Sequence, residues 1–544
     1  MTTAVVDIET DSLDASRIHC IVAQHYHTGE MREWIGDQCK EFGEWSKKID
    51  TFIMHNGLSF DAPVLNRLTG SKISSSQVRD TLLESQLFNP IREGGHSLKA
   101  WGNKLNSHKI DYDNFDEFTL DMLDYCKQDV SLTRKVAQEL EKESVEFSKK
   151  SYELERNIRV IIDQQERNGF AFNIREGQLL LAKLEDEQHE LEKQSLEMFE
   201  PTIVELKTKT KEIPFNIASR KQIADRLIDR GWSPSVYTEK GNVVVNEAVL
   251  SKIKMPEAEM FSRYFLLQKR TGLLKSWIKE CSNDLRVHGS VLTLKTITGR
   301  MAHHSPNMAQ VPAVYSPYGK ECRALWGVSD SNTHKLVGTD ASGLELRCLA
   351  HYMNDTNFTE EVLTGDVHTA NQKAAGLKTR DQAKTFIYAF LYGAGPAKIG
   401  KVVGGSASTG QRLISKFLSN MPALKRLRSN VSEAAQAGTI KGLDGRRLQI
   451  RSEHAALNTL LQGAGAIVCK QWLVQINEKV RRSGIDAKLV ASVHDEYQFE
   501  VAKPDVQRFC KLTKEAMYQT QKIFNFKCDL DSDYKVGNNW AETH

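Results

Sequence analysis

The sequence predicts a multidomain protein of mixed α/β and α+β class, and three observations support this prediction. The chain has 544 residues, and roughly 100–200 residues per domain would give about three to five domains. Residues 1–140 alternate short apolar runs with helical patterns, as α/β domains do. Residues 145–277 repeat apolar positions at helical spacing, and strand and helix patterns mix again from Gly289 onward.

The composition fits a globular protein without a membrane anchor. Apolar residues make up 40% and charged residues 26% of the chain, both ordinary for globular domains. No apolar run approaches the roughly 18 residues of a membrane helix, and the first residues lack the basic and apolar regions of a secretion signal. Nine cysteines without a C-x-x-C pair favour a reducing compartment and argue against a zinc site or disulfides. We therefore expect no membrane partner.

Charge is distributed unevenly along the chain. The net charge is only +3, but residues 1–140 carry 22 acidic and 15 basic side chains, which gives −7 and leaves +10 for residues 141–544. An acidic N-terminal segment is compatible with metal binding, and a basic remainder of the chain is compatible with phosphate binding. Many enzymes show such asymmetry by chance, so the motifs have to carry the functional prediction.

An acidic cluster is predicted in the front segment. Asp7 and Glu9 stand two positions apart on an apparent strand, so their side chains share one face. Taken alone, this spacing is more often a solvated strand face. Later segments add Asp61 after an apolar run, and Tyr125 and Asp129 at i and i+4 of a helix. Four carboxylates can hold two Mg²⁺ ions and a tyrosine hydroxyl can orient water, which indicates two-metal phosphodiester hydrolysis.

A second pair of acids is predicted from strand patterns in the last part of the chain. Residues 336–341 form an apolar run with Asp340 at its end. Asp495 lies between two strand-like segments, residues 488–493 and 497–501, whose alternation is typical of a half-buried hairpin. Two acids on neighbouring strands can hold two Mg²⁺ ions that activate a hydroxyl and neutralise a triphosphate.

One predicted helix between these acids carries cations and aromatic rings on a single face. Arg380, Lys384, Tyr388 and Tyr392 recur every four residues, so they form one slowly drifting stripe on an α-helix. Cations at one end can meet phosphates, and rings farther along can stack on a base or a sugar. For this helix alone, an amphipathic helix with solvated basic residues would be the commoner explanation.

Taken in order, the front motifs resemble those of proofreading 3′-5′ exonucleases with four acids and a tyrosine. The later motifs resemble those of family A DNA polymerases, the relatives of bacterial DNA polymerase I, and in particular the replicative enzymes of short-tailed bacteriophages of the T-seven type. The resemblance covers nearly the whole chain. Further matching motifs are Thr298-Gly299-Arg300, Ser305-Pro306-Asn307, Gly365-Asp366-Val367-His368-Thr369, Asn458-Thr459-Leu460-Leu461-Gln462 and Asn538-Asn539-Trp540-Ala541.

This resemblance implies an RNase H-like 3′-5′ exonuclease domain followed by a right-hand polymerase domain with palm, fingers and thumb. The fingers would close on a correct nucleotide and complete the metal site, and a frayed primer end would move to the first acidic cluster. The implied boundaries are 1–142 for the exonuclease, 143–285 for the helical thumb, 286–362 for the first part of the palm, 363–452 for the fingers and 453–544 for the second part of the palm.

The resemblance also implies which residues hold metal. At the exonuclease site, Tyr125 would position the attacking water, and the metal ligands would be Asp7, Glu9, Asp61 and Asp129. At the polymerase site, Asp340 and Asp495 would be the catalytic metal ligands, helped by the main-chain carbonyl of Ala341. Two Mg²⁺ ions per site are the expected cofactors, and Mn²⁺ can substitute.

The same resemblance assigns nucleotide and DNA contacts. The triphosphate would be bound by His368, Arg380 and Lys384, and Lys384 could also donate a proton to the leaving pyrophosphate. Tyr388 would lie near the incoming sugar, and Glu345 would be a steric gate against a ribose 2′-OH. The expected DNA contacts are Arg300, Gln462, Tyr392 and His494, of which the first two would read minor-groove acceptors that every base pair shares.

Three of these assignments have structural alternatives. Glu496 would support the metal site, but a role in packing or strand pairing also fits its position between strands. His368 could be a satisfied structural histidine. Gln462 could be a residue on a helix surface.

Two segments depart from the phage-type pattern. The phage enzymes carry a long thumb insertion that captures host thioredoxin as a clamp. The corresponding interval here covers only about residues 199–216, so no thioredoxin clamp is expected. The lysines of this interval could touch the duplex backbone or form a solvated loop: Lys207, Lys209 and Lys211. The exonuclease is also shortened between residues 87 and 121, so weaker exonuclease activity is expected.

The sequence thus predicts a DNA-templated DNA polymerase that transfers nucleotides from dNTPs to a primer 3′-OH and proofreads them. It would replicate phage DNA in the cytoplasm of an infected bacterial host. Its partners would be primer–template DNA and dNTPs, with a replicative helicase-primase as a further candidate, and a monomer is expected. A single-chain RNA polymerase is an alternative that Glu345 and the exonuclease motifs disfavour. A repair-type enzyme or a non-catalytic DNA-binding relative is another, and the intact acids at both sites disfavour a non-catalytic chain.

Overall fold

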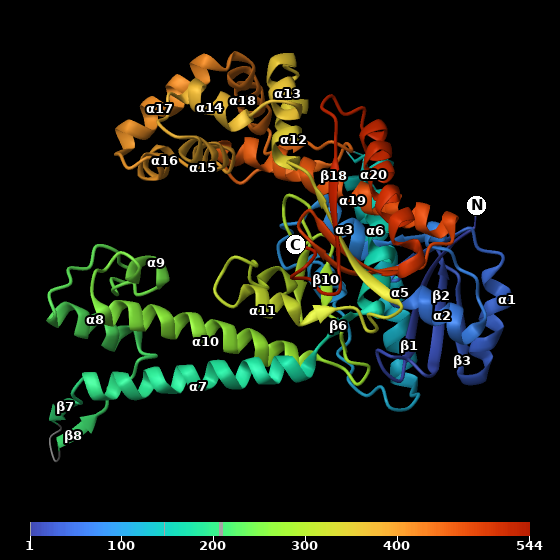
Figure 1. The fold of residues 1–544 in the computed structure, drawn as a ribbon. Helices are drawn as coiled ribbons and strands as arrows, with labels where there is room; N and C mark the ends of the chain where they lie inside the picture. Colours follow the sequence, from blue (N-terminus) through green and yellow to red (C-terminus); the bar gives the residue numbers. More distant parts are fainter. Residues whose placement is uncertain (1, 146, 206–209) are drawn as a thin grey trace. The chain divides into compact units, whose positions relative to one another are not determined.

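The computed structural model describes residues 2–145, 147–205 and 210–544, and the chain forms two compact units (Figure 1). Unit 1 comprises Met1–Asn168, Val291–His303 and Val337–Tyr534. Unit 2 comprises Gly169–Ser290, His304–Leu336 and Lys535–His544. Within the described ranges, no helix combines the length and the apolar character that a bilayer span requires.

The front of unit 1 is a five-stranded mixed sheet in the order β3-β2-β1-β4-β5. β1 pairs antiparallel with β2 and parallel with β4, so it is the central strand. The strand predicted around Asp7 and Glu9 is confirmed as β1, and the apolar run before Asp61 forms β4. The strands are β1 (Thr3–Thr10), β2 (Ile18–His25), β3 (Met31–Ile35), β4 (Thr51–Met54) and β5 (Val78–Asp80).

Helices pack on both faces of this sheet because β1 is apolar on both faces. Val6 belongs to one buried cluster, whereas Val5 belongs to another that includes Cys126 of α5. Side chains alternate along a strand, so Asp7 and Glu9 lie on the same face as Val5, toward α5. The helices are α1 (Phe42–Ser46), α2 (Asp61–Thr69), α3 (Thr81–Phe88), α4 (Leu98–Lys104) and α5 (Leu120–Ser144).

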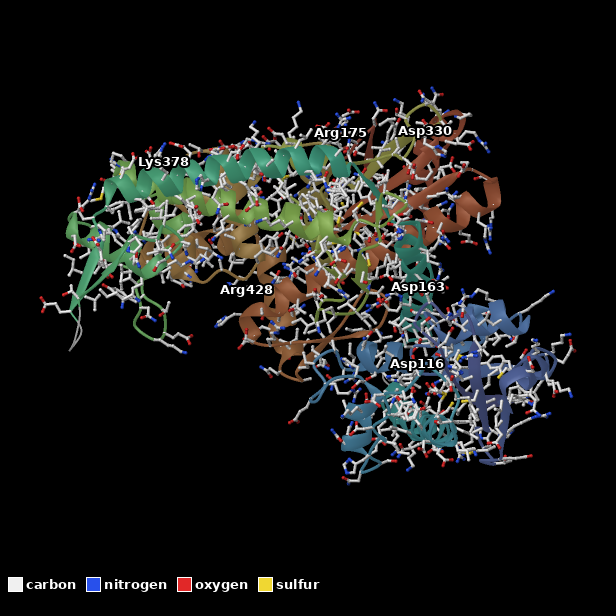
Figure 2. All side chains as sticks on the ribbon, turned by 90° about the horizontal axis from the view of Figure 1, so that it is seen from below. Asp116, Asp163, Arg175, Asp330, Lys378 and Arg428 are labelled. Carbon is white, nitrogen blue, oxygen red and sulfur yellow. The ribbon has the colours of Figure 1, made fainter. Side chains whose placement is uncertain are left out.

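One helix, α6 (Lys149–Asn168), is shared between the front sheet and the rest of unit 1. The Tyr152 hydroxyl accepts a hydrogen bond from the backbone amide of Asp80 at 2.8 Å. Asp163, labelled in Figure 2, accepts one from the Ser59 hydroxyl at 3.0 Å. The apolar side of α6, which includes Ile158, is buried in the core cluster of the rear part. The same helix therefore contributes to two cores.

The rear part of unit 1 is built on a four-stranded sheet in the order β16-β17-β13-β18. β16 and β17 pair antiparallel with Val493 opposite Glu496, so a two-residue turn of His494 and Asp495 joins them. His494 has a φ of 57°, the left-handed conformation that such turns require. The hairpin predicted from the sequence is confirmed. The strands are β13 (His334–Ala341), β16 (Ala487–Val493), β17 (Glu496–Ala502) and β18 (Ser532–Gly537).

Helices dominate the remainder of unit 1, and α14 to α18 gather into one group (Figure 1). α15 confirms the helix that the four-residue spacing predicts. The helices are α12 (Leu344–Met353), α13 (Thr356–Leu363), α14 (Val367–Ala375), α15 (Arg380–Leu391), α16 (Pro396–Val402), α17 (Ala407–Asn420), α18 (Pro422–Ala435), α19 (Ala456–Ser483) and α20 (Val506–Ile523). The two short strand pairs are β14 (Thr439–Lys441) with β15 (Arg447–Gln449), and β10 (Ser290–Leu292) with β11 (Ala302–His304).

In unit 2, two long helices lie side by side (Figure 1): α7 (Ile174–Met198) and α10 (Pro256–Glu280). A turn at Gly169 precedes α7: Gly169 has a φ of +61°, and a Cβ there would lie 2.7 Å from the His288 ring. A three-stranded sheet in the order β12-β6-β9 carries a buried aromatic cluster of Phe170, Phe172, Trp277, Trp326 and Trp540. Its strands are β6 (Phe170–Phe172), β9 (Arg286–Val287) and β12 (Trp326–Gly327).

The interval that the sequence suggested as a lysine-rich connector contains strands. β7 (Thr202–Glu205) pairs antiparallel with β8 (Thr210–Ile213). Lys211 lies in β8, whereas Lys207 and Lys209 lie outside the described residues. The remaining helices of unit 2 are α8 (Arg220–Asp229), α9 (Glu247–Leu250) and α11 (Gly319–Ala324).

Candidate active sites

The structure brings the four predicted acids of the front sheet together beside α5. Asp7 and Glu9 project from β1, Asp61 is the first residue of α2, and Asp129 lies on α5. Burial raises the pKa of Asp7 well above its usual value, and the charges of the other three acids raise it further. Four carboxylates that repel one another at close range form a site for cations.

The acids of this first cluster resist ionisation in the absence of a metal ion. Glu9 is 7% exposed and Asp61 3% exposed. Burial, followed by the charge of Asp129, raises the pKa of Glu9 to about 8. Burial raises the pKa of Asp61 to about 7. A divalent cation would offset both effects, because it stabilises the ionised carboxylates.

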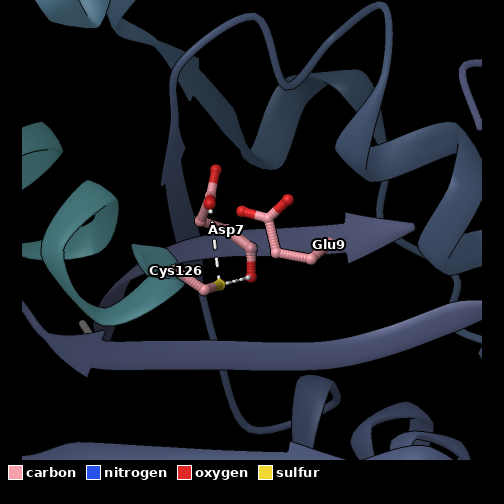
Figure 3. A group of neighbouring side chains, drawn as sticks. All are labelled: Asp7, Glu9 and Cys126. Carbon is pink, nitrogen blue, oxygen red and sulfur yellow. Dashed lines mark hydrogen bonds between the residues drawn. The ribbon is translucent and has the colours of Figure 1, made fainter. Parts of the chain in front are cut away.

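The donor set of the first cluster fits a hard divalent cation. One carboxylate oxygen each of Asp7 and Glu9 lies within 4.8 Å of the other and of the Cys126 sulfur (Figure 3). Asp129 Oδ1 is buried and accepts no hydrogen bond from the described residues. Mg²⁺ prefers carboxylate oxygens, so this orphaned oxygen is suited to coordinate it.

Two residues at this cluster were not predicted from the sequence. Lys109 Nζ lies 2.5 Å from Asp129 Oδ2 and 4.5 Å from the centre of the Tyr125 ring. The Cys126 thiol donates to the Asp7 backbone oxygen at 3.5 Å and lies 3.6 Å from Asp7 Oδ2, the two dashed lines in Figure 3. Cys126 could have been found, because it stands three residues before Asp129 on the helix. Lys109 lies in an irregular segment without a periodic signal.

A pH effect on stability follows from the raised pKa values of Glu9 and Asp61. An acid whose pKa is raised by folding stabilises the fold fully below its unfolded pKa, and this contribution is lost progressively as the pH rises through its folded pKa. In EDTA, stability should therefore fall as the pH rises from about 4.5 to about 8, the range that Glu9 spans. Mg²⁺ should accordingly raise the melting temperature more at pH 8 than at pH 6. In the double variant Glu9→Gln/Asp61→Asn this difference should shrink, and an equal Mg²⁺ effect at both pH values in the intact protein would contradict the prediction.

The second predicted pair of acids meets at the end of β13. Asp340 lies near the end of that strand, and Asp495 lies in the turn between β16 and β17. The backbone amide of Ala341 donates to the backbone carbonyl of Asp495 at 3.1 Å, which fixes the turn against β13. Both charges reach the buried Cys469 thiol on α19 and help to raise its pKa, after burial itself. The backbone contact and the shared effect on Cys469 place both carboxylates in the same region of unit 1, beside α19.

A pocket in unit 1 joins Asp495 to other predicted residues. Arg300, Glu345 and His494 line it together with Asp495. Lys470 of α19 lines it too and was not predicted. A tight turn after β13 brings Glu345 to the pocket. Gly343 has a φ of +59° and caps α12, which begins only three residues after the strand ends.

Glu345 forms hydrogen bonds with two other predicted residues, Tyr392 and Arg300. It accepts one from the Tyr392 hydroxyl at 2.6 Å and one from Arg300 at 3.4 Å, with Oε1 as the acceptor in both. Burial raises the pKa of the Tyr388 hydroxyl, and the charges of Glu345 and Asp495 raise it further. Both tyrosines of the α15 stripe therefore lie near Glu345, which lines the pocket.

The cationic end of the α15 stripe lies beside His368 of α14. Burial lowers the pKa of His368, and the charges of Arg380 and Lys384 lower it further. Nδ1 of His368 is buried and forms no hydrogen bond with the described residues. Asp366, which was not predicted as a site residue, accepts a hydrogen bond from Arg380 at 2.8 Å. His368, Arg380 and Lys384 therefore lie close enough together to contact the same phosphate group.

The last two predicted residues lie on α19 and β17. Gln462 is half-buried on α19. Glu496 is the first residue of β17, is 7% exposed and accepts a hydrogen bond from Gln498 at 2.5 Å.

A buried ion network lies behind the pocket and was not predicted. Lys470 donates to both carboxylate oxygens of Glu155 on α6, at 2.8 and 2.7 Å. Arg446, at the end of the β14–β15 turn, donates to Glu155 at 2.6 Å and to Asp444 at 2.7 Å. All four side chains are at most 3% exposed. Two cations and two anions thus balance one another inside unit 1.

The chain is similar to known proteins in both sequence and structure. A sequence model described as DNA polymerase family A matches residues 181–542. The chain is 32% identical to a DNA-directed DNA polymerase of Escherichia phage T7, and equally to one of Enterobacteria phage T3, over 99% of this chain and 100% of each relative. Among solved structures, it is similar to the POL domain of Pol1 from M. smegmatis in complex with DNA primer-template and dNTP.

The structural similarity extends along the full chain. The TM-score is 0.83 at 17% sequence identity, covering 100% of this chain and 96% of the solved one. This likeness shows a shared multidomain fold, and the predicted mixed α/β and α+β class is confirmed. The family match covers well over half of the 544 residues, and the phage relatives exceed 30% identity over their whole length. The chain belongs to DNA polymerase family A.

Proposed function

We propose that this chain is a DNA-templated DNA polymerase that also carries a 3′-5′ proofreading exonuclease. The observation that carries the proposal is the convergence of Asp340 and Asp495 with Glu345, Arg300 and the α15 stripe in unit 1. A second, separate set of four carboxylates beside Tyr125 supports the exonuclease. The names of the phage relatives favour the polymerase activity.

At the polymerase site, each group has a separate task. Asp340 and Asp495, with the Ala341 carbonyl, would hold two Mg²⁺ ions. When bound, these ions activate the primer 3′-OH and neutralise the triphosphate. Arg380 and His368 would grip the phosphates while the 3′ oxygen bonds to the α-phosphorus and the bond to pyrophosphate breaks. Lys384 would give a proton to the departing pyrophosphate. Tyr388 would support the incoming sugar, and the expected DNA contacts remain Arg300, Gln462, Tyr392 and His494, with Glu496 as a support of the metal site.

At the exonuclease site, two divalent cations would again stabilise the reacting oxygens, here for hydrolysis. Asp7, Glu9, Asp61 and Asp129 would hold two divalent cations, which lower the cost of charge on the attacking and leaving oxygens. Tyr125 would orient the water that attacks the last phosphodiester bond. The burial of these acids supports this role, since a dry and crowded acid cluster ionises fully only when a cation offsets its charge.

The proposal also includes domain boundaries, ligands and partners. The proposed domains are 1–142, 143–285, 286–362, 363–452 and 453–544. Primer–template DNA and dNTPs would be the ligands, with Mg²⁺ or Mn²⁺ as cofactor, a monomer as the active form and a helicase-primase as a candidate partner on phage DNA. We also propose that no thioredoxin clamp is used. The alignment to the phage relatives spans 705 positions against 544 residues here, so the relatives contain segments that this chain lacks.

A steric gate at Glu345 gives a testable selectivity. In Glu345→Ala, the side chain that would meet a ribose 2′-OH is removed, so discrimination against ribonucleotides should fall about 10- to 100-fold, or roughly 1.4–2.8 kcal/mol. The measurement is the ratio of kcat/KM for a dNTP and the matching NTP. Tyr392→Phe is the control, because it removes the hydrogen bond to Glu345 but leaves the carboxylate in place. Equal discrimination in Glu345→Ala and the intact protein would rule out the gate.

The proposed activities can be tested on one labelled primer annealed to a DNA template. With Mg²⁺ and dNTPs the primer should lengthen, and without dNTPs it should shorten, faster when its 3′ end is mismatched. EDTA should stop both reactions. DNA binding without lengthening or shortening would favour a non-catalytic relative, and efficient use of NTPs would favour an RNA polymerase.

A further inference from the structure

Lys109 occupies the first acidic cluster from a segment that the proposed mechanism does not use. It lies between α4 and α5, and its side chain is 20% exposed against 5% for its partner Asp129. Its ammonium nitrogen is 2.5 Å from Asp129 Oδ2. The other oxygen, Asp129 Oδ1, is buried and receives no hydrogen bond from the described residues. Asp129 therefore has one oxygen bound to an ammonium and one free for a further cation.

Lys109 is the resident cation of this cluster. Within residues 2–145, 147–205 and 210–544, no other lysine or arginine forms an ion pair with Asp7, Glu9, Asp61 or Asp129. Lys127, two residues before Asp129, pairs instead with Glu33 at 2.7 Å. The charge of Lys109 also reaches Asp7 and Glu9 and lowers the repulsion that each experiences. One fixed positive charge thus partly neutralises three of the four acids, Asp7, Glu9 and Asp129.

The backbone around Lys109 is fixed to α5 on both sides. The Gln128 side chain accepts a hydrogen bond from the Ile110 amide at 2.5 Å and donates one to the His108 carbonyl at 2.6 Å. Gln128 immediately precedes Asp129. Two adjacent residues of α5 therefore have separate roles: Asp129 presents the acid, and Gln128 holds the segment that carries Lys109. An irregular surface segment without such a clamp would not place an ammonium at 2.5 Å from a buried acid.

We propose that Lys109 is a built-in counter-ion that competes with divalent metal for Asp129 and so weakens metal binding at the exonuclease site. This inference rests on the proposed exonuclease. A metal ion on Asp129 Oδ1 would share the single charge of that carboxylate with the ammonium on Oδ2, and no covalent change is involved. The segment between α4 and α5 that carries Lys109 thus sets the metal concentration at which the site becomes active. Synthesis at Asp340 and Asp495 is not affected by this competition.

The competition is tested by Mn²⁺ affinity, which does not depend on any reaction. In an Asp340→Asn/Asp495→Asn background, which disables the other metal site, Lys109→Met should bind Mn²⁺ at least about tenfold more tightly, as measured by electron paramagnetic resonance of free Mn²⁺. Lys99→Met is the matched control, because Lys99 pairs with Asp111 at 3.0 Å and with none of the four acids. Its affinity should equal that of the background protein.

A double-variant cycle shows whether the effect passes through Asp129. In an Asp129→Asn protein the shared carboxylate has lost its charge, so adding Lys109→Met should change Mn²⁺ affinity less than it does with Asp129 intact. Gln128→Leu, which releases the clamp but keeps the ammonium, should tighten Mn²⁺ binding to an intermediate extent. It also tests the proposal should Lys109→Met fold poorly. Unchanged or weaker Mn²⁺ binding in both Lys109→Met and Gln128→Leu would overturn the proposal.

Degradation of a single-stranded oligonucleotide separates this proposal from the exonuclease itself. The Mn²⁺ concentration for half-maximal degradation should fall in Lys109→Met by the same factor as the dissociation constant. Slower degradation at saturating Mn²⁺ with unchanged metal affinity would instead make Lys109 a substrate contact and overturn the proposal. If no variant and no intact protein degrades DNA, the proposed exonuclease fails, whereas the Mn²⁺ titration still decides the role of Lys109.

Discussion

Asp495→Asn should extend a DNA primer at least about a thousandfold more slowly than the intact protein and still shorten the same primer at the intact rate. The substitution removes one charged ligand of the proposed metal pair, and a thousandfold loss corresponds to about 4 kcal/mol of transition-state stabilisation. The fold should survive, because Asp495 contacts β13 through its backbone carbonyl, which accepts from the Ala341 amide. Primer extension and single-turnover degradation, measured in parallel, check both halves of this expectation.

The reciprocal variant makes the comparison decisive. Asp7→Asn removes an acid of the first cluster, so degradation should be lost to a similar degree while extension continues. Two independent sites predict this crossed pattern, whereas a single shared site predicts that each variant loses both activities. The crossed pattern would also exclude global unfolding as the cause, since each variant keeps one activity.

Glu155→Gln should destabilise unit 1 by about 3–5 kcal/mol, the usual range for a buried ion pair that loses one partner. The glutamine would keep the shape of the side chain but leave Lys470 and Arg446 sharing the single carboxylate of Asp444. The present contacts of Glu155 are 2.6–2.8 Å long and fully buried, so little water can compensate the charge. Urea denaturation monitored by tryptophan fluorescence measures the change.

Two further variants define what the buried network contributes. Glu44→Gln breaks an exposed pair with Lys47, and exposed pairs contribute at most about 1 kcal/mol, so this control should be nearly neutral. In Glu155→Leu/Lys470→Met, one anion and one cation leave together and apolar side chains take their place. Part of the lost stability should return. A Glu155→Gln protein as stable as the intact one would show that the network does not support the fold.

The sequence predicted those features that depend on local spacing. The strand with Asp7 and Glu9, the hairpin around Asp495 and the stripe of α15 each follow from a period of two or of about four residues. Their elements form as expected because neighbouring residues alone decide which face is apolar. Spacing therefore placed the acids on their strands and helix, whereas their roles as metal ligands rest on the resemblance to known polymerases and exonucleases.

The features that escaped prediction depend on contacts between distant residues. Glu155 and Lys470 are 315 positions apart, and neither stands in a pattern that singles it out. Lys109 lies in an irregular segment whose course is fixed by Gln128, a contact that no periodicity reveals. Tertiary contacts override local preference at such positions. β7 and β8 escaped for a different reason, since they form a local hairpin in an interval whose lysines suggest a solvated connector.

The double attachment of α6 has a consequence for how unit 1 loses its structure. This helix binds Asp80 and Ser59 of the front sheet through Tyr152 and Asp163, and its apolar side completes the rear core. Melting either part would expose surface that α6 buries for the other. Both chemical sites therefore share one cooperative transition, and a chain truncated to remove the front sheet would leave part of α6 uncovered and prone to aggregation.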